Sequence, residues 1–186
     1  MNSNANKGRR DREETKARII EVAKQVFSEK GYSQAGLREI AARSNVAGSL
    51  LVKYFDTKAN LFETALTMAL IDPRLFQSDR SHFGEAIVQS IDEPKLSVLA
   101  PAMIALSLGD NEAMAVIAKV SREHILDPVA SWLGPPDAGA RASFILMLTT
   151  GYAIFGRHIA MHDSEKVRRR IAKLVSRALQ AAVDEN

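Results

Sequence analysis

The segment from Gly36 to Lys58 constrains the fold of this chain most, because it contains two short helical patterns separated by a tight corner. In the first pattern, Leu37, Ile40 and Ala41 recur at helical spacing and predict one buried face. The corner contains Asn45, and asparagine tolerates the left-handed backbone conformation that a sharp turn between helices requires. The segment therefore predicts two helices that pack against each other across a turn.

The second helix of this pair has a distinctive outer face. Its spacing directs Val46, Leu51 and Phe55 inward. The residues that the same spacing directs outward are Gly48, Ser49, Val52, Lys53 and Tyr54. A short helix whose outer face carries small residues, one lysine and one tyrosine fits a major groove about 12 Å wide. The segment therefore predicts a helix that reads duplex DNA.

The motifs between Arg12 and Leu66 occur in a specific order. A long helical pattern ends in Phe27-Ser-Glu-Lys-Gly-Tyr32, and an Ile-Ala pair follows. Residues 45–61 then read Asn-Val-Ala-Gly-Ser-Leu-Leu-Val-Lys-Tyr-Phe-Asp-Thr-Lys-Ala-Asn-Leu. These motifs resemble the amino-terminal domain of the TetR family of bacterial transcriptional regulators. The resemblance implies a helix-turn-helix DNA-binding domain whose first helix covers the two reading helices.

Four positions depart from the pattern of that family. Gly36 stands where the family usually has a threonine cap, and Ala47 stands where a serine would cap the recognition helix. Asn45 replaces the turn glycine. Val52 replaces a tyrosine that donates to the DNA backbone in many members, and a valine can instead contact a thymine methyl group. These departures imply that this chain forms fewer hydrogen bonds to the DNA backbone than other members of the family do.

The outward-facing pattern and the resemblance together assign two kinds of DNA contact. The predicted base-reading residues are Arg38, Gly48, Ser49, Val52 and Lys53. The predicted backbone contacts are Lys7, Arg9, Arg10, Tyr54, Thr57 and Lys58. Lys58 stands at the expected start of the next helix, where free backbone N–H groups and the positive end of the helix dipole favour a phosphate.

Charge is distributed unevenly along the chain. Residues 1–60 carry 12 Lys and Arg against 7 Asp and Glu, whereas residues 61–160 carry 7 against 11. A basic amino-terminal part suits a molecule that binds a polyanion at one end, because neutralising phosphates releases counterions and so contributes to binding affinity. The alternative, that these charges only solvate helix faces, is less consistent with the motif beside them.

The chain predicts an all-α fold of about nine helices, with no strand patterns and no internal repeat. Residues 1–11 are polar and lack periodicity, which predicts a flexible basic arm. The expected divisions that follow are a DNA-binding domain at 12–57, a linking helix at 58–71 and a ligand-binding and dimerisation domain at 72–186. Within the last of these, helical patterns cover about 83–91, 95–107, 111–133, 137–161 and 164–183.

The last two helical patterns carry broad apolar stripes that contain small residues. Such a stripe can be intramolecular core, but the resemblance implies that these helices form a four-helix interface with a second copy. The residues expected in that interface are Phe155, Ile159, Ile171, Leu174 and Ala178. A symmetric dimer suits a palindromic DNA site.

The resemblance also implies a pocket in the carboxy-terminal domain for a small-molecule effector, whose identity no residue indicates. The candidate lining residues are Met103, Ile117, Ser121, His124, Phe144 and Met147. The same apolar residues are compatible with an ordinary core.

Other functional classes receive less support from the sequence. The chain has no cysteine and no glycine-rich phosphate loop, so we expect no enzymatic activity, no cofactor and no metal. His158 and His162 have the spacing of a metal pair but lack an evident third ligand. A small metal-dependent enzyme and a helical ligand-binding or interaction module with a weakened reading head remain as alternatives. We expect a cytoplasmic protein without a membrane span, since no signal-peptide pattern opens the sequence.

Overall fold

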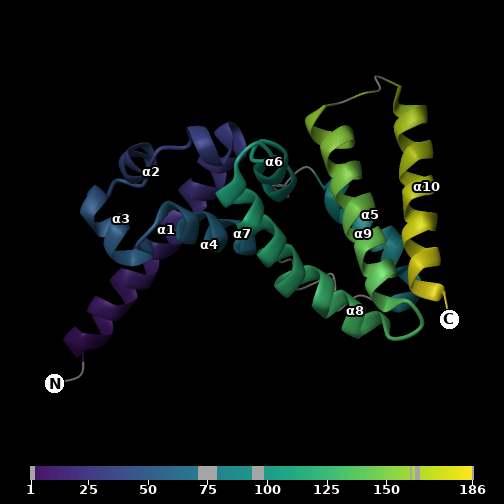
Figure 1. Ribbon diagram of the computed structural model, residues 1–186, viewed down its shortest axis with the longest axis horizontal. Coiled ribbons are helices and arrows are strands. Elements are labelled where there is room, and N and C mark those ends of the chain that lie inside the picture. The colour runs from purple at the N-terminus through teal and green to yellow at the C-terminus, as the bar shows by residue number, and fades with distance from the viewer. Residues whose placement is uncertain (1–2, 71–78, 94–98, 160, 162–163, 186) are drawn as a thin grey trace.

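The computed structural model describes residues 3–70, 79–93, 99–159, 161 and 164–185, and every regular element in these ranges is a helix (Figure 1). The amino-terminal head consists of α1 (Ser3–Gln34), α2 (Leu37–Arg43), α3 (Gly48–Phe55) and α4 (Lys58–Leu70). The all-helical prediction is confirmed for the described part of the chain.

The remaining helices form the carboxy-terminal body. They are η2 (Arg80–His82), α5 (Phe83–Asp92), α6 (Leu99–Ala105), α7 (Asn111–Ser121), α8 (Asp127–Leu133), α9 (Ala138–Ala153) and α10 (Glu165–Asp184). A π-helical turn, η3 (Arg122–Leu126), joins α7 to α8 without a break, and a second, η4 (Ile154–His158), extends α9. When α7, η3 and α8 are counted as one rod, the described chain has nine α-helical rods, as the sequence predicts.

Helix α1 begins much earlier than the sequence pattern indicates. Residues 1–11 are expected to form an irregular arm, yet the helix already begins at Ser3 and projects beyond the rest of the head (Figure 1). At its other end α1 bends at Gly31, which has φ of 70°. A side chain at this position would collide with the carbonyl oxygen of Leu106 at the end of α6, so glycine permits both the bend and the close approach.

Two hydrophobic cores hold the molecule together. The first contains an aromatic cluster in which the Phe62 ring centroid lies 4.9 Å from that of Phe27 and 5.1 Å from that of Tyr32. It also includes Met103 of α6 and Val120 of α7, so α6 and α7 pack with the head. The second core joins α5, α8, α9 and α10. Hydrophobic packing therefore crosses the domain boundary that the sequence places at residue 72.

A buried arginine fastens the second core. Arg141 is only 4% exposed, and its guanidinium donates to backbone carbonyl oxygens of two segments that lie far apart in the sequence. These acceptors are Pro136 at 2.9 Å, Glu185 at 2.9 Å, Ala182 at 3.3 Å and Gly134. The carbonyls at the end of α10 carry the negative end of a helix dipole, which favours a cation. Arg141 thus ties the loop before α9 to the carboxyl end of α10.

Candidate nucleic-acid interface

The corner between α2 and α3 is rigidly closed. Asn45 has φ of 53°, which confirms the left-handed conformation predicted there. The Ser44 hydroxyl is buried and donates to the carbonyl oxygen of Ile40 at 2.7 Å. Arg18 of α1 donates to the carbonyl oxygen of Ser44 at 3.0 Å, which satisfies an acceptor at the end of α2. These contacts fix the orientation of α3 relative to α2.

Helix α3 buries one side and leaves the other open. Leu51 and Phe55 are buried in the first core, and Val46 packs against it. The opposite side exposes Gly48, Ser49, Val52 and Lys53. Val52 is 49% exposed, so about half of this apolar side chain remains open to solvent. The division between inward and outward residues on this helix therefore agrees with the predicted one, with the exception of Tyr54.

Tyr54 is half-buried rather than fully outward. Its ring packs edge-on against Phe55 with centroids 6.4 Å apart, and the Lys16 ammonium lies 5.6 Å from the ring centroid. Lys16 of α1 thus lies beside the recognition helix, although it is not among the predicted DNA contacts. The local sequence gives no signal for it, because 38 positions separate the two residues and only the packing of α1 on α3 brings them together.

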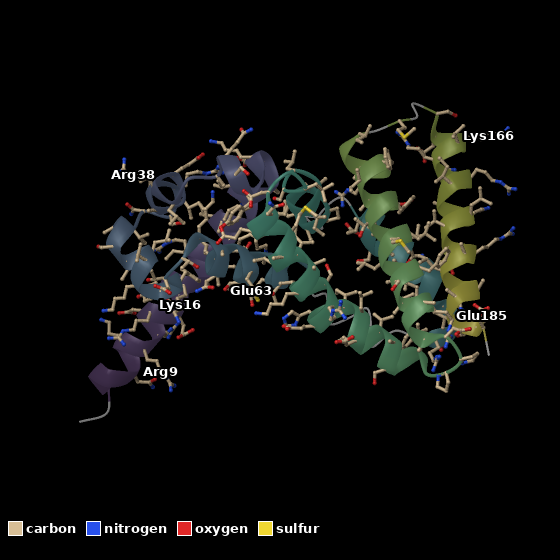
Figure 2. All side chains as sticks on the ribbon, in the orientation of Figure 1. Arg9, Lys16, Arg38, Glu63, Lys166 and Glu185 are labelled. Atoms are coloured by element: carbon tan, nitrogen blue, oxygen red, sulfur yellow. The ribbon has the colours of Figure 1, made fainter. Side chains whose placement is uncertain are left out.

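The cations of the head fall into two groups. Arg43 bonds to Glu29 at 2.8 Å, and this hydrogen bond holds the pKa of Glu29 below its ordinary value. Lys30 pairs with Glu39 at 2.7 Å. Arg38 and Lys53 have no ion-pair partner among the described residues, and both are exposed. Figure 2 shows Arg38 at the outer edge of the head.

The amino ends of α2 and α3 lack the hydroxyl groups that usually cap a helix. Gly36 and Ala47 occupy the two cap positions in extended conformations, and neither forms a side-chain cap. Thr57 does cap α4, since its hydroxyl oxygen accepts from the backbone N–H of Asn60 at 3.1 Å. The hydroxyl proton of Thr57 is left to donate to another acceptor.

The expected backbone-contact lysine of α4 turns back toward the body. The Lys58 ammonium lies 4.5 Å from the ring centroid of Tyr32 and donates to the carbonyl oxygen of Ser33 at 3.4 Å. Burial lowers the pKa of Lys58, and the carboxylates of Asp110 and Glu112 oppose this shift. Lys58 is thus near the predicted interface, but its ammonium already contacts the Tyr32 ring and the Ser33 carbonyl oxygen.

The three cations expected in the arm lie on the first turns of α1. Lys7, Arg9 and Arg10 are exposed, and Arg10 pairs with Glu14 at 2.9 Å. Figure 2 shows Arg9 near the projecting end of this helix. An α-helix with its side chains is about 10–12 Å across, which is too wide for a minor groove about 6 Å wide, so in this conformation the first turns of α1 do not fit inside that groove.

A second surface lies on the far side of the body, where α9 and α10 leave apolar side chains uncovered. Phe155, Ile159 and Leu174 are each more than half exposed, while Ile171 and Ala178 are half-buried. The segment Ala138–Arg157 is long and apolar enough to cross a membrane, with a mean hydropathy of 1.2 and only 22% of its apolar window buried. Phe155, Ile159 and Leu174 thus leave apolar surface open to solvent on α9, η4 and α10.

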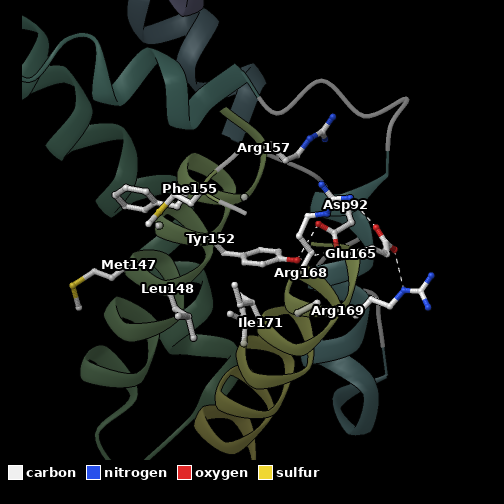
Figure 3. Close-up of a pocket in the computed structure, with 15 residues that line it drawn as sticks. Asp92, Met147, Leu148, Tyr152, Phe155, Arg157, Glu165, Arg168, Arg169 and Ile171 are labelled. Carbon is white, nitrogen blue, oxygen red and sulfur yellow. Dashed lines mark hydrogen bonds and ion pairs between the residues drawn. The ribbon is translucent and has the colours of Figure 1, made fainter. Parts of the chain in front are cut away.

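This surface contains a cavity of about 750 Å³ between α9, η4 and α10 (Figure 3). Its apolar wall includes Phe155 and Ile171. At its polar end, the Tyr152 hydroxyl donates to the Asp92 carboxylate at 2.9 Å, and burial together with this bond raises the pKa of Tyr152. Glu165 pairs there with Arg168 at 2.8 Å and with Arg169 at 2.9 Å.

The six candidate effector residues do not gather around this cavity. Met103 is fully buried in the first core, and of the six only Met147 lines the cavity. Ile117, Ser121 and His124 are half-buried on α7 and η3, and Phe144 is 42% exposed. The apolar spacing from which they were chosen is thus shared by core and surface positions. Their role as an effector pocket remains a prediction.

The predicted metal pair falls partly outside the described residues. His162 is one of the undescribed residues, and the structure describes only the backbone of His158, which belongs to η4. Among the described residues, no group of three or more His, Cys, Asp or Glu side chains is arranged to hold a metal ion.

Comparison with protein families gives two matches that together span most of the chain. The family model described as bacterial regulatory proteins, tetR family, matches residues 19–65. The model described as tetracyclin repressor-like, C-terminal domain, matches residues 81–183, which is more than half of the chain. No curated protein sequence matches this chain.

Several solved structures share the fold at low sequence identity. Native NalD, the secondary repressor of the MexAB-OprM multidrug efflux pump in Pseudomonas aeruginosa, is 16% identical over 89% of this chain and 96% of its own, with a TM-score of 0.63. The fatty acid degradation regulator FadR from Bacillus halodurans is 17% identical over 91% of this chain and 98% of its own, with a TM-score of 0.64. A regulator from Streptomyces coelicolor is 24% identical over 92% and 95%, with a TM-score of 0.54. These similarities establish the shared fold.

Proposed function

The chain belongs to the TetR family of bacterial regulatory proteins, and from this premise we propose that it is a homodimeric repressor that binds a palindromic operator and responds to a small molecule. At the coarser level it is a DNA-binding transcriptional regulator and not an enzyme. The proposal adds the direction of regulation, the assembly and the effector.

One observation carries the proposed DNA-reading role. The exposed side of α3 presents Ser49, Val52 and Lys53, and Arg38 on α2 is the neighbouring cation without a carboxylate partner in the described chain. Lysine and arginine donate to guanine in the major groove, and valine can meet a thymine methyl group. Tyr54, Thr57, Lys58 and the basic first turns of α1 are the proposed contacts to the DNA backbone.

The proposed dimer is supported by the apolar face of α9 and α10. Phe155, Ile159 and Leu174 expose surface that a second copy of the same two helices would cover, in a symmetric contact of like faces. Two heads related by a twofold axis address two half-sites related by the same symmetry. For helix-turn-helix dimers the spacing of half-sites is about 34–36 Å or a multiple of it.

The proposed response to a small molecule follows from linkage. An effector can lower the affinity for DNA only if it binds more tightly to a conformation that fits DNA poorly. The size of the decrease is limited by the difference between its affinities for the two conformations. Helix α7 is a suitable route, because it packs with the head in the first core while η3 and α8 continue it into the second. Because the proposed partner is genomic DNA, we place the protein in the cytoplasm.

Selection of bound genomic fragments tests the proposed function directly. The purified protein is incubated with sheared genomic DNA at physiological salt, and retained fragments are sequenced. We expect enrichment of fragments that share an inverted repeat, and Lys53→Ala should reduce that enrichment selectively. Retention of fragments without a common repeat would contradict operator recognition. Failure to retain duplex DNA at all would favour the alternative of a helical module with a weakened reading head.

A further inference from the structure

The head and the body meet at a polar corner formed by residues 31–33 at the end of α1 and residues 107–112 between α6 and α7. We call it the α1–α7 corner. Three hydrogen bonds cross it: the Tyr32 N–H donates to Ser107 Oγ at 2.9 Å, the Ser33 hydroxyl donates to Asp110 Oδ2 at 2.8 Å, and the Tyr32 hydroxyl donates to the Glu112 carboxylate. The corner therefore fixes two carboxylates of the body against the head.

Both carboxylates are held in place by hydrogen bonds. Asp110 caps α7, since its Oδ1 accepts from the backbone N–H of Ala113 at 3.0 Å. This bond, together with the bond from Ser33, holds the pKa of Asp110 below its ordinary value. Glu112 is fixed by the hydroxyl of Tyr32, whose own pKa rises through burial and through this contact. The corner thus presents two fixed carboxylates near Lys58, the first residue of α4.

Lys58 lies against this corner. Its ammonium is 4.5 Å from the ring centroid of Tyr32, where burial lowers the pKa of Lys58 and the charges of Asp110 and Glu112 oppose that shift. An ammonium over an aromatic face with carboxylates nearby is favoured in the absence of a phosphate. Any DNA phosphate that binds Lys58 must compete with these groups.

We propose that Asp110 and Glu112 are positioning residues for Lys58, which they hold at the α1–α7 corner and thereby weaken as a phosphate contact. The inference rests on the proposed function, in which Lys58 binds the DNA backbone. It adds that two carboxylates of the same chain determine how much the contact between Lys58 and a phosphate contributes to DNA affinity.

The position of α7 then controls the contact. Besides the corner, Lys119 of α7 pairs with Glu63 of α4 at 2.7 Å, so α7 is tied to α4 at a second point. A shift of α7 relative to α4 moves the two carboxylates away from Lys58 or toward it. Carboxylates that approach hold Lys58 more firmly and lower the affinity for every DNA sequence.

The test uses nearly isosteric variants that remove charge and keep the hydrogen bonds. In Asp110→Asn the remaining side-chain oxygen can still cap α7, while the new amide group can donate to the Ser33 hydroxyl; in Glu112→Gln the oxygen can still accept from Tyr32. Binding of the double variant to a random-sequence 30-base-pair duplex is measured by fluorescence anisotropy over a range of salt. We expect roughly threefold to tenfold tighter binding and a steeper salt dependence, by up to about one in the logarithmic slope.

The same charge changes are repeated with Lys58→Ala, where we expect no gain in affinity. Glu123→Gln with Asp127→Asn, exposed acids farther along the same rod, serves as a matched control and should leave the slope unchanged. An equal gain with and without Lys58 would mean that the carboxylates act through the general field of the protein, and would overturn the proposal. Unchanged or weaker binding of the Asp110/Glu112 double variant would also overturn it.

A measurement without DNA separates this inference from the proposed function. Because the Lys58 ammonium lies 4.5 Å from the centroid of the Tyr32 ring, we expect the ring current to shift the NMR signals of the adjacent methylene protons upfield. We expect that shift to decrease in the double variant. A decrease in a protein that binds no duplex would refute the DNA-binding role of Lys58 but support the positioning role. An unchanged shift would refute the positioning role, whatever the affinity for DNA.

Discussion

Lys53 and Arg38 differ from the neighbouring Arg43 and Lys30 at the scale of single residues, because no carboxylate in the described chain holds them. A cation that is already paired must give up its partner before it binds a base, whereas a free one loses only water. We therefore expect sequence discrimination to depend on Lys53 and Arg38 more than on the paired cations.

Replacement of these cations separates base contacts from backbone contacts. Lys53→Ala and Arg38→Ala should each cost about 1–3 kcal/mol on the selected operator and relax the preference at particular base pairs. Lys58→Ala should weaken binding to all sequences and reduce the salt slope by only a fraction of one, because Asp110 and Glu112 compete with the phosphate for Lys58. Anisotropy titrations on operator and random duplexes measure both effects. Equal losses on the two duplexes for all three variants would contradict the assignment.

The missing caps of α2 and α3 lead to a stability prediction. Ala47→Ser supplies a hydroxyl that can accept from the first turn of α3 and should raise the free energy of unfolding by about 1 kcal/mol. Gly36→Ser at the start of α2 is the matched comparison and should add only a few tenths of a kcal/mol, because glycine is itself a tolerated cap. Urea unfolding measures both variants. A larger gain at Gly36 than at Ala47 would contradict this account.

Among the helices, Arg141 couples the loop before α9 to the carboxyl end of α10, two segments that lie far apart in the sequence. Its substitution by alanine leaves several buried carbonyl oxygens without a donor, so we expect a loss of about 3 kcal/mol in the free energy of unfolding. Arg141→Lys should recover only part of this loss, because one ammonium cannot reproduce the planar fork of donors. Denaturant unfolding provides the measurement.

The control for Arg141 is an arginine on the surface of α10. Arg177 is exposed and has no ion-pair partner among the described residues, so Arg177→Ala should change the unfolding free energy by no more than about 0.5 kcal/mol. Similar losses for the two variants would show that the carbonyl contacts of Arg141 contribute little to stability.

Several elements were predictable from the sequence, and their ends were less so. The spacing of Leu51 and Phe55 predicts α3, and Asn45 predicts the corner, since both signals are local. The early start of α1 was missed because residues 3–11 have no apolar periodicity; their helix is stabilised by continuity with the packed part of α1. The half-buried position of Tyr54 was also missed, because it depends on α1 packing beside α3.

At the scale of the whole molecule, the apolar face of α9 and α10 predicts an assembly. Leu174→Glu or Phe155→Glu places a charge where the second copy is expected, and should convert the dimer into a monomer with much weaker operator binding. Sedimentation equilibrium measures the mass. Met68→Glu changes an exposed methionine of α4 in the same way and should leave the mass of the dimer unchanged. A dimeric Leu174→Glu protein would place the interface elsewhere.

The helical class, the helix-turn-helix and the outward side of α3 follow from the amino-acid sequence alone, because they depend on periodicity and on turn residues that act within a few positions. The packing of α6 and α7 with the head, the contacts of Arg141 and the position of Lys58 over Tyr32 emerge only in the folded chain. Each of these contacts joins residues that are distant along the chain. Such contacts follow from the way whole helices fill space together, and no local pattern encodes them.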